Sequence, residues 1–224
     1  MSIGQINIEN VGIIQIEEGL NSISIEVPEL YGRVVNTIQL GIDDLIVYSE
    51  DHKTKQLNKV GIFLGDPVSG DNIRDAYSKF VFSILSHSIS EEGMEQLYNL
   101  NIEMQSVINQ EIIENNLPLT VESGWELERL LKSQKIELDN PHENRISGKI
   151  ENVIHTMGML NEKRYLILTN LPLYCDMSEL NLLHQCLLAE GINLISLNLL
   201  RGNTITDEKF KVSHIDQDFV LFTQ

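Results

Sequence analysis

Proline, cysteine and basic residues are all scarce in this sequence. Only 5 prolines and 2 cysteines occur among 224 residues, and 16 lysines and arginines stand against 33 aspartates and glutamates. No apolar run approaches the roughly 18 residues that a membrane-spanning helix needs. Hydrophobic residues still make up 42% of the chain, so we expect an ordinary globular protein with a substantial core.

The shortage of positive charge limits the partners that the chain can attract. Its net charge of -17 repels nucleic acid, anionic membrane surfaces and acidic substrates at long range, which excludes binding through a basic tail. Cys175 and Cys186 lack Cys-x-x-Cys spacing, so neither a disulfide framework nor a zinc site is expected. Two free thiols fit a reducing compartment, and we expect a cytoplasmic protein without a membrane partner.

The two ends of the chain carry strand patterns. Near the C-terminus, residues 165–168 and 192–197 are short apolar runs, and leucines at helical spacing separate them. This order predicts a right-handed parallel strand, helix, strand unit. Near the N-terminus, residues 13–16 and 23–27 alternate between apolar and polar, which predicts an antiparallel hairpin, and Pro28 then opens a helix.

Helical patterns fill the middle of the chain, from Asp71 to about Leu160. The expected fold class is therefore α/β, with a head domain formed by residues 1–70 and 160–224. The sheet of this head domain is expected to be mainly parallel. Residues 71–159 are expected to form an inserted α-helical leg domain.

A nucleotide site would lie where the apolar run 60–64 meets a glycine-rich turn. Gly65 and Gly70 have the glycine spacing of a phosphate-binding loop, but Asp71 and Asn72 replace the required Lys and Ser or Thr. Asn170 stands where an acidic magnesium-positioning residue is needed. The histidines and cysteines match no catalytic motif either. We therefore expect no catalytic residues, no bound nucleotide and no enzymatic activity.

Positive charge gathers at two places in the chain. One cluster lies between two expected strands, and the other follows one face of a helix. One interpretation is two phosphate-binding patches, and the other is ordinary solvated surface charge. The candidate DNA-binding residues are Lys53, Lys55, Lys59, Arg129, Lys132 and Lys135.

The order of these features resembles the Csn-two family of type II-A CRISPR systems. Five segments carry the resemblance, and together they span nearly the whole chain. They are residues 21–36, 53–55, 135–137, 163–170 and 216–222.

The resemblance implies a fold, a function and a set of partners. The implied fold is an α/β head that resembles a degenerate P-loop fold and carries a helical leg. The resemblance also implies a ring-shaped homotetramer that binds the ends of double-stranded DNA, slides along linear DNA and acts in the acquisition of new spacers. Other type II-A CRISPR proteins are the implied further partners. Four copies of a modest basic patch would converge on one duplex, while the outer carboxylates stay distant and screened.

The resemblance also implies bound calcium. The candidate ligands are Glu122, Glu126 and Glu128, although calcium needs six to eight oxygens and these residues supply fewer carboxylates than the family pattern. A competing interpretation is that Ser123 and Glu126 form a capping box at a helix start. Trp125, between them, is expected to be partly buried.

Two other function classes remain open on the sequence. The chain could be a small nucleotide-dependent enzyme that uses an unorthodox site. It could instead be an acidic scaffold whose helical arm docks a protein partner. Salt dependence separates these from DNA binding, because only phosphate contacts weaken steeply with salt.

Overall fold

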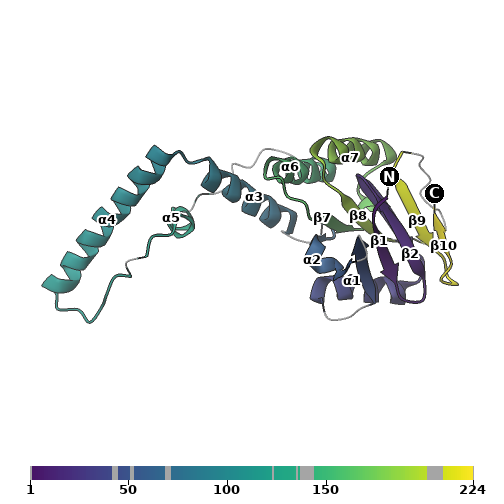
Figure 1. The fold of residues 1–224 in the computed structure, drawn as a ribbon, viewed down its shortest axis with the longest axis horizontal. Helices are drawn as coiled ribbons and strands as arrows, with labels where there is room; N and C mark the ends of the chain where they lie inside the picture. The colour runs from purple at the N-terminus through teal and green to yellow at the C-terminus, as the bar shows by residue number, and fades with distance from the viewer. Residues whose placement is uncertain are drawn as a thin grey trace. The chain divides into compact units, whose positions relative to one another are not determined.

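The computed structural model describes residues 2–41, 45–50, 53–68, 72–122, 124–134, 136, 144–200 and 209–223. It divides into two compact units (Figure 1). The head unit comprises Met1–Phe80 and Pro141–Gln224, and the leg unit comprises Val81–Asn140. The mixture of helices with a mainly parallel sheet confirms the expected α/β class.

A six-stranded sheet forms the centre of the head unit. Its strand order is β10-β9-β3-β8-β7-β6, and every neighbouring pair is parallel except β9 with β10. The strands are β3 (Leu20–Ile25), β6 (Gly61–Gly65), β7 (Tyr165–Thr169), β8 (Leu194–Leu199), β9 (Lys211–Ile215) and β10 (Leu221–Thr223).

A second, antiparallel sheet covers one face of the central sheet. Its order is β2-β1-β4-β5, so β2 and β5 are its edges. Apolar side chains from both sheets and from α1 meet in one buried cluster. The strands and nearby helices are β1 (Ser2–Ile8), β2 (Gly12–Glu17), β4 (Ile46–Glu50), β5 (Lys53–Gln56), α1 (Pro28–Leu40) and α2 (Leu57–Val60).

Helices cover the opposite face of the central sheet. The chief ones are α6 (Ile146–Met159) and α7 (Met177–Glu190), which lie side by side (Figure 1). Alternate strand residues face the two layers: Leu166 and Leu168 pack toward the helices, whereas Ile167 packs toward the second sheet. This period of two is what a sheet buried on both faces requires.

The C-terminal crossover unit forms as the sequence predicts. Strands β7 and β8 pair in parallel, and α7 connects them after the short 3-10 helix η1 (Leu171–Leu173). Asp176 and Glu179 form a capping box at the start of α7. Gly191 ends the helix with φ +65, a left-handed conformation that glycine adopts without strain.

The prediction that residues 13–16 and 23–27 pair with each other in a hairpin is wrong. Strand β2 pairs with β1, whereas β3 lies between β8 and β9 in the other sheet. All six residues of β3 are buried, including Asn21, Ser22 and Ser24. Alternating polar residues are typical of a strand with one solvated face. The alternation in β3 therefore predicted pairing with β2, although β3 is buried on both faces. Asn198 donates its side-chain amide to the Ser22 hydroxyl at 3.0 Å, which satisfies one of these buried groups.

The boundaries expected for the leg domain also differ from the observed division. Helix α6 belongs to the head unit, because Ile150, Val153 and Met157 lie in its core. Helix α3 (Asn72–Ser88) begins in the head unit, with Ile73 and Phe80 buried there. The 71–159 boundaries therefore included apolar helix faces that complete the cover of the central sheet.

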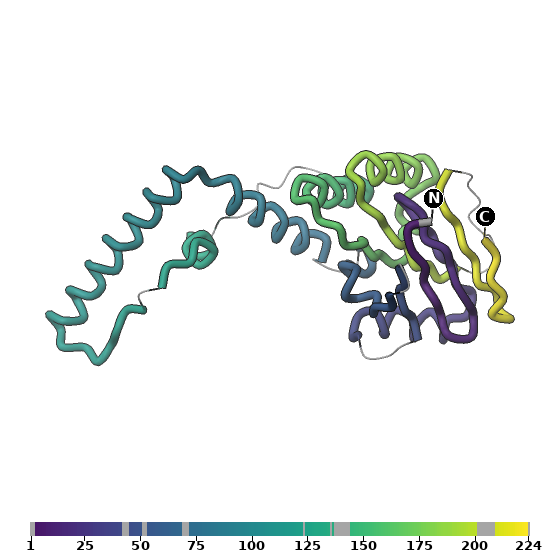
Figure 2. The backbone as a smooth tube through the Cα atoms, viewed as in Figure 1, coloured from purple at the N-terminus to yellow at the C-terminus, as the bar shows by residue number. Residues whose placement is uncertain are grey.

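The leg unit is built around one long helix. It contains the second half of α3, then α4 (Glu91–Glu114) and α5 (Leu127–Ser133), as the traced backbone shows (Figure 2). Ser90 caps α4 by accepting a hydrogen bond from the Gly93 amide at 3.1 Å. No residue of this 24-residue helix is buried within the chain.

Candidate nucleic-acid interface

The strand end where a nucleotide would bind is occupied by internal hydrogen bonds. Asp66 follows β6, and its carboxylate accepts from the Val68 amide at 2.9 Å and from the Tyr174 hydroxyl at 3.0 Å. The bond to Asp66 raises the pKa of Tyr174. Asn72 donates its side-chain amide to the Leu64 carbonyl at 3.0 Å. Gly70 and Asp71 lie outside the described residues.

The neighbouring strand end is closed in the same way. Asn170 follows β7 with φ +55, and its side-chain oxygen accepts from the Leu199 amide at 3.0 Å. Burial raises the pKa of Tyr31, although hydrogen bonds with Thr169 and Asn170 partly offset this rise. Carboxylate, amide and phenol groups therefore fill the edge at which phosphate chemistry would need an ammonium group and a metal.

The predicted head cluster lies at the edge of the antiparallel sheet. Lys53 and Lys55 are exposed on β5, which pairs only with β4, and Lys59 is exposed in the following α2. Buried Leu57 anchors α2 between them. Among the described residues, no carboxylate forms an ion pair with any of the three lysines. The described part of the head cluster thus presents three exposed cations without a paired carboxylate.

The predicted leg cluster is paired internally. Arg129 contacts Glu126 through Nε at 2.7 Å and Glu122 through Nη1 at 3.3 Å. Lys132 contacts Glu128 at 3.5 Å, one helical turn away on α5. Lys135 lies outside the described residues. The structure thus places Arg129 and Lys132 among the very glutamates that the sequence suggested as calcium ligands.

These three glutamates do not fit a calcium cage. Glu122 and Glu126 converge on a guanidinium group, and Glu128 turns to Lys132. In the part of the chain that the structure describes, no group of three or more histidine, cysteine or acidic side chains could hold a metal ion. The capping-box interpretation fails as well, because α5 starts at Leu127 and Glu126 is its N-cap without a side-chain bond.

An apolar groove runs along α4. It has a volume of about 670 Å³ and lies between α4 and α5, with Leu100, Met104 and Val107 on one side and Leu130 and Leu131 on the other. Leu100 and Val107 are 55% and 63% exposed. The helical spacing of these residues is visible in the sequence, but their exposure is not.

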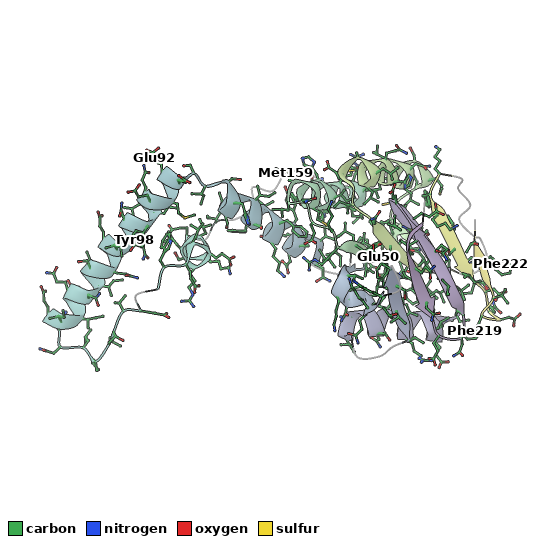
Figure 3. All side chains as sticks on the ribbon, viewed as in Figure 1. Glu50, Glu92, Tyr98, Met159, Phe219 and Phe222 are labelled. Atoms are coloured by element: carbon green, nitrogen blue, oxygen red, sulfur yellow. The ribbon has the colours of Figure 1, made fainter. Side chains whose placement is uncertain are left out.

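Trp125 packs inside the leg unit. Tyr98 projects from α4 (Figure 3). The Trp125 ring meets the Tyr98 ring edge to face at a centroid distance of 5.7 Å. The tryptophan is half-buried, as expected. This contact holds the segment before α5 against α4, together with the bond from the Gln105 side chain to the Glu122 carbonyl.

The cysteines show no sign of a reactive thiolate. Burial raises the pKa of Cys175 to about 11, and it also raises that of Cys186. Both thiols are free. A thiol with a raised pKa is a poor nucleophile near neutral pH.

Comparison with known protein families finds one whose model matches most of the chain. A family model described as CRISPR-associated protein (Cas_Csn2) matches residues 41–219, which is more than half of the sequence and includes both basic clusters. The chain belongs to this family. The match confirms the resemblance seen in the sequence and gives this Csn2 family protein a CRISPR-associated role. Among individual curated proteins, none matches the chain.

The structure also adds residues that the sequence did not indicate. Three residues from separate segments meet at the strand ends: Tyr31, Asp66 and Tyr174. No sequence motif predicted their position. No helix in the described ranges is long and apolar enough to cross a membrane.

Proposed function

We propose that this Csn2 family protein binds double-stranded DNA without reading its sequence, as part of spacer acquisition in CRISPR adaptation. The observation that carries the proposal is the gathering of scarce positive charge into an exposed cluster on β5 and α2. Lysines on a strand edge and a short helix suit phosphate contacts. They do not form a base-reading helix in a groove.

The protein acts as a homo-oligomer, and the family resemblance favours a ring of four around linear DNA. Support comes from α4, which leaves Leu100, Met104, Val107 and Ile108 exposed on a helix without buried residues. A contiguous apolar face of this kind is typical of a protein interface. Bringing copies together also multiplies a basic patch that would be too weak alone in a chain of net charge -17.

The proposal includes no catalysis and no nucleotide cofactor. Asp66, Asn72 and Asn170 are committed to internal hydrogen bonds at the strand ends where a nucleotide would sit. Other type II-A CRISPR proteins are the proposed further partners, in the cytoplasm. Neither Cys175 nor Cys186 forms a disulfide bond, which agrees with a reducing compartment.

An acidic protein-interaction scaffold is the second candidate function, and the exposed face of α4 is the observation that favours it. Salt dependence distinguishes the two. Binding through phosphates loses affinity with a log-log slope of about 0.9 per neutralised phosphate, whereas an apolar interface is nearly insensitive to salt.

A mobility-shift titration of linear duplex against covalently closed circles tests the proposal. We expect the linear duplex to be retained at several unrelated sequences, with affinity falling steeply as salt rises. Closed circles should escape, because a ring must be threaded. Equal affinity for both forms would contradict the ring, and no binding to either would contradict the DNA-binding function. ATP turnover above a denatured control would contradict the absence of catalysis.

A further inference from the structure

The two basic clusters differ in what surrounds them. On β5 and α2, three exposed lysines have no ion-pair partner among the described residues. Lys53 lies opposite Glu50 in the β4–β5 register, yet the two do not form an ion pair. Within the described residues, this cluster therefore presents three exposed cations at the open edge of a sheet.

The geometry of β5 directs this charge outward. Lys53 and Lys55 are two residues apart, so their side chains leave the strand on the same face. The chain then turns into α2, where buried Leu57 fixes the position of exposed Lys59. Lysine ammonium groups at an open edge can follow a phosphate backbone without a matching groove.

On α5 the cations already have partners. Arg129 bridges Glu122 and Glu126, and Lys132 pairs with Glu128. Three carboxylates face two cations, so the described part of this cluster carries a net negative charge. A phosphate approaching it would have to displace a carboxylate from Arg129 and would meet the repulsion of the released group.

We propose that Lys53, Lys55 and Lys59 form the surface that contacts DNA phosphates, whereas Arg129 and Lys132 stabilise the leg. This assignment rests on the proposed DNA binding and divides its two clusters by role. Arg129 is a structural residue that joins the segment before α5 to the helix. The lysines of the head are the ligand-binding residues.

A rival explanation exists for lysines on an edge strand. Charged side chains at such positions also prevent edge-to-edge aggregation. Glutamate also hinders strand pairing, because it places a charge of the same magnitude on the edge strand. Charge reversal therefore separates the two explanations: it preserves protection of the edge and abolishes attraction to phosphate.

The test is the full-length triple variant K53E/K55E/K59E, measured against linear duplex at about 150 mM salt. We expect affinity to fall at least ~100-fold with unchanged solubility and unfolding temperature. The neutral triple K53Q/K55Q/K59Q should lower the salt slope by up to about 2.7 for each engaged protomer, or about 0.9 per lysine.

A matched control comes from the same unit. Arg74, Lys79 and Lys149 are exposed, have no ion-pair partner among the described residues, and lie on helices α3 and α6 and not on β5 or α2. The variant R74E/K79E/K149E changes net charge by the same amount. We expect it to weaken binding less than tenfold, through screened long-range repulsion alone. Lys132→Gln should change affinity by less than about twofold.

The outcomes distinguish failure of the assignment from failure of the function. If the wild type binds duplex and both glutamate triples lose affinity equally, net charge explains the effect and the assignment is overturned. Loss in Lys132→Gln with retention in K53E/K55E/K59E would overturn it in favour of the leg. A wild type that does not bind duplex at all would instead contradict the proposed function.

Discussion

The head and leg units bury their apolar residues in opposite ways. In the head, two sheets and several helices enclose clusters that include Ile167, Leu197 and Val153, all at 0% exposure. In the leg, α4 buries none of its 24 residues and leaves Val107 63% exposed. The head is stabilised by its own core. The leg presents an apolar face, and a helix gains most of its stability in water by packing such a face.

The two units also differ in how their basic residues are paired. The leg pairs Arg129 and Lys132 with its own glutamates, whereas no described carboxylate pairs with the head cluster of Lys53, Lys55 and Lys59. The comparison teaches that each unit leaves a different kind of group unsatisfied. The leg offers apolar surface suited to another protein, and the head offers positive charge suited to phosphate.

The largest expected difference between the units concerns stability. Ile167→Ala should lower the free energy of unfolding by about 2 to 5 kcal/mol, because it removes a fully buried side chain from the centre of the sheet. Val107→Ala should change it by less than about 0.5 kcal/mol in dilute protein. Urea unfolding monitored by circular dichroism measures both. Similar losses for the two variants would contradict the contrast.

The next effect concerns self-association. The double variant M104S/V107S should weaken assembly at least about tenfold, because it places hydroxyl groups on the apolar face of α4. Sedimentation analysis over a concentration series measures the change. Glu95→Gln, on the opposite side of the same helix, is the control and should leave assembly unchanged. Unaltered assembly in M104S/V107S would show that this face is not the interface.

A smaller effect tests a contact within the head. The hydroxyls of Tyr48 and Tyr165 lie 2.8 Å apart and link the two sheets. Tyr165→Phe should cost about 0.5 to 1.5 kcal/mol near neutral pH, because that hydrogen bond is lost. Differential scanning calorimetry measures the change.

The same tyrosine makes stability depend on alkaline pH. Burial raises the pKa of Tyr165, and Tyr48 and Glu50 raise it further. Its contribution is therefore complete below the unfolded pKa of about 10 and is lost as pH rises beyond that value. The wild type should lose stability between pH 9.5 and 11, and Tyr165→Phe should lose less. Parallel curves for the two proteins would contradict this assignment.

The smallest effect concerns the leg ion pairs. Arg129 and its partners are more than half exposed, so Arg129→Gln should cost no more than about 1 kcal/mol. Calcium or a chelator should leave the unfolding temperature and the Trp125 emission unchanged, because a guanidinium already holds Glu122 and Glu126. A calcium-dependent rise in unfolding temperature that disappears in E122Q/E126Q would show that these carboxylates bind the metal.

Several parts of the fold follow from local patterns. The strand, helix, strand unit from Tyr165 to Leu199 was predictable because its apolar runs, capping residues and terminal glycine all act over a few residues. The apolar face of α4 was equally visible as helical spacing. Both basic clusters were also visible, because β5 and α5 each gather their cations within one short segment.

Other parts depended on residues far apart in the chain. Strand β3 looked like half of a hairpin, yet its polar residues are buried between β8 and β9. Helix α6 was assigned to the leg, because its periodicity indicates an apolar face without saying what covers it. The closure of the strand ends by Tyr31, Asp66 and Tyr174 required three segments to meet.

The sequence by itself therefore determined the α/β class, the family, the broken phosphate loop and the location of scarce positive charge. These features depend only on residue types and on their spacing along the chain. Only the tertiary structure decided that glutamates neutralise Arg129 and Lys132, while no carboxylate among the described residues pairs with the head lysines. Ion pairing depends on distances of a few ångströms between side chains, and folding fixes those distances where sequence spacing does not.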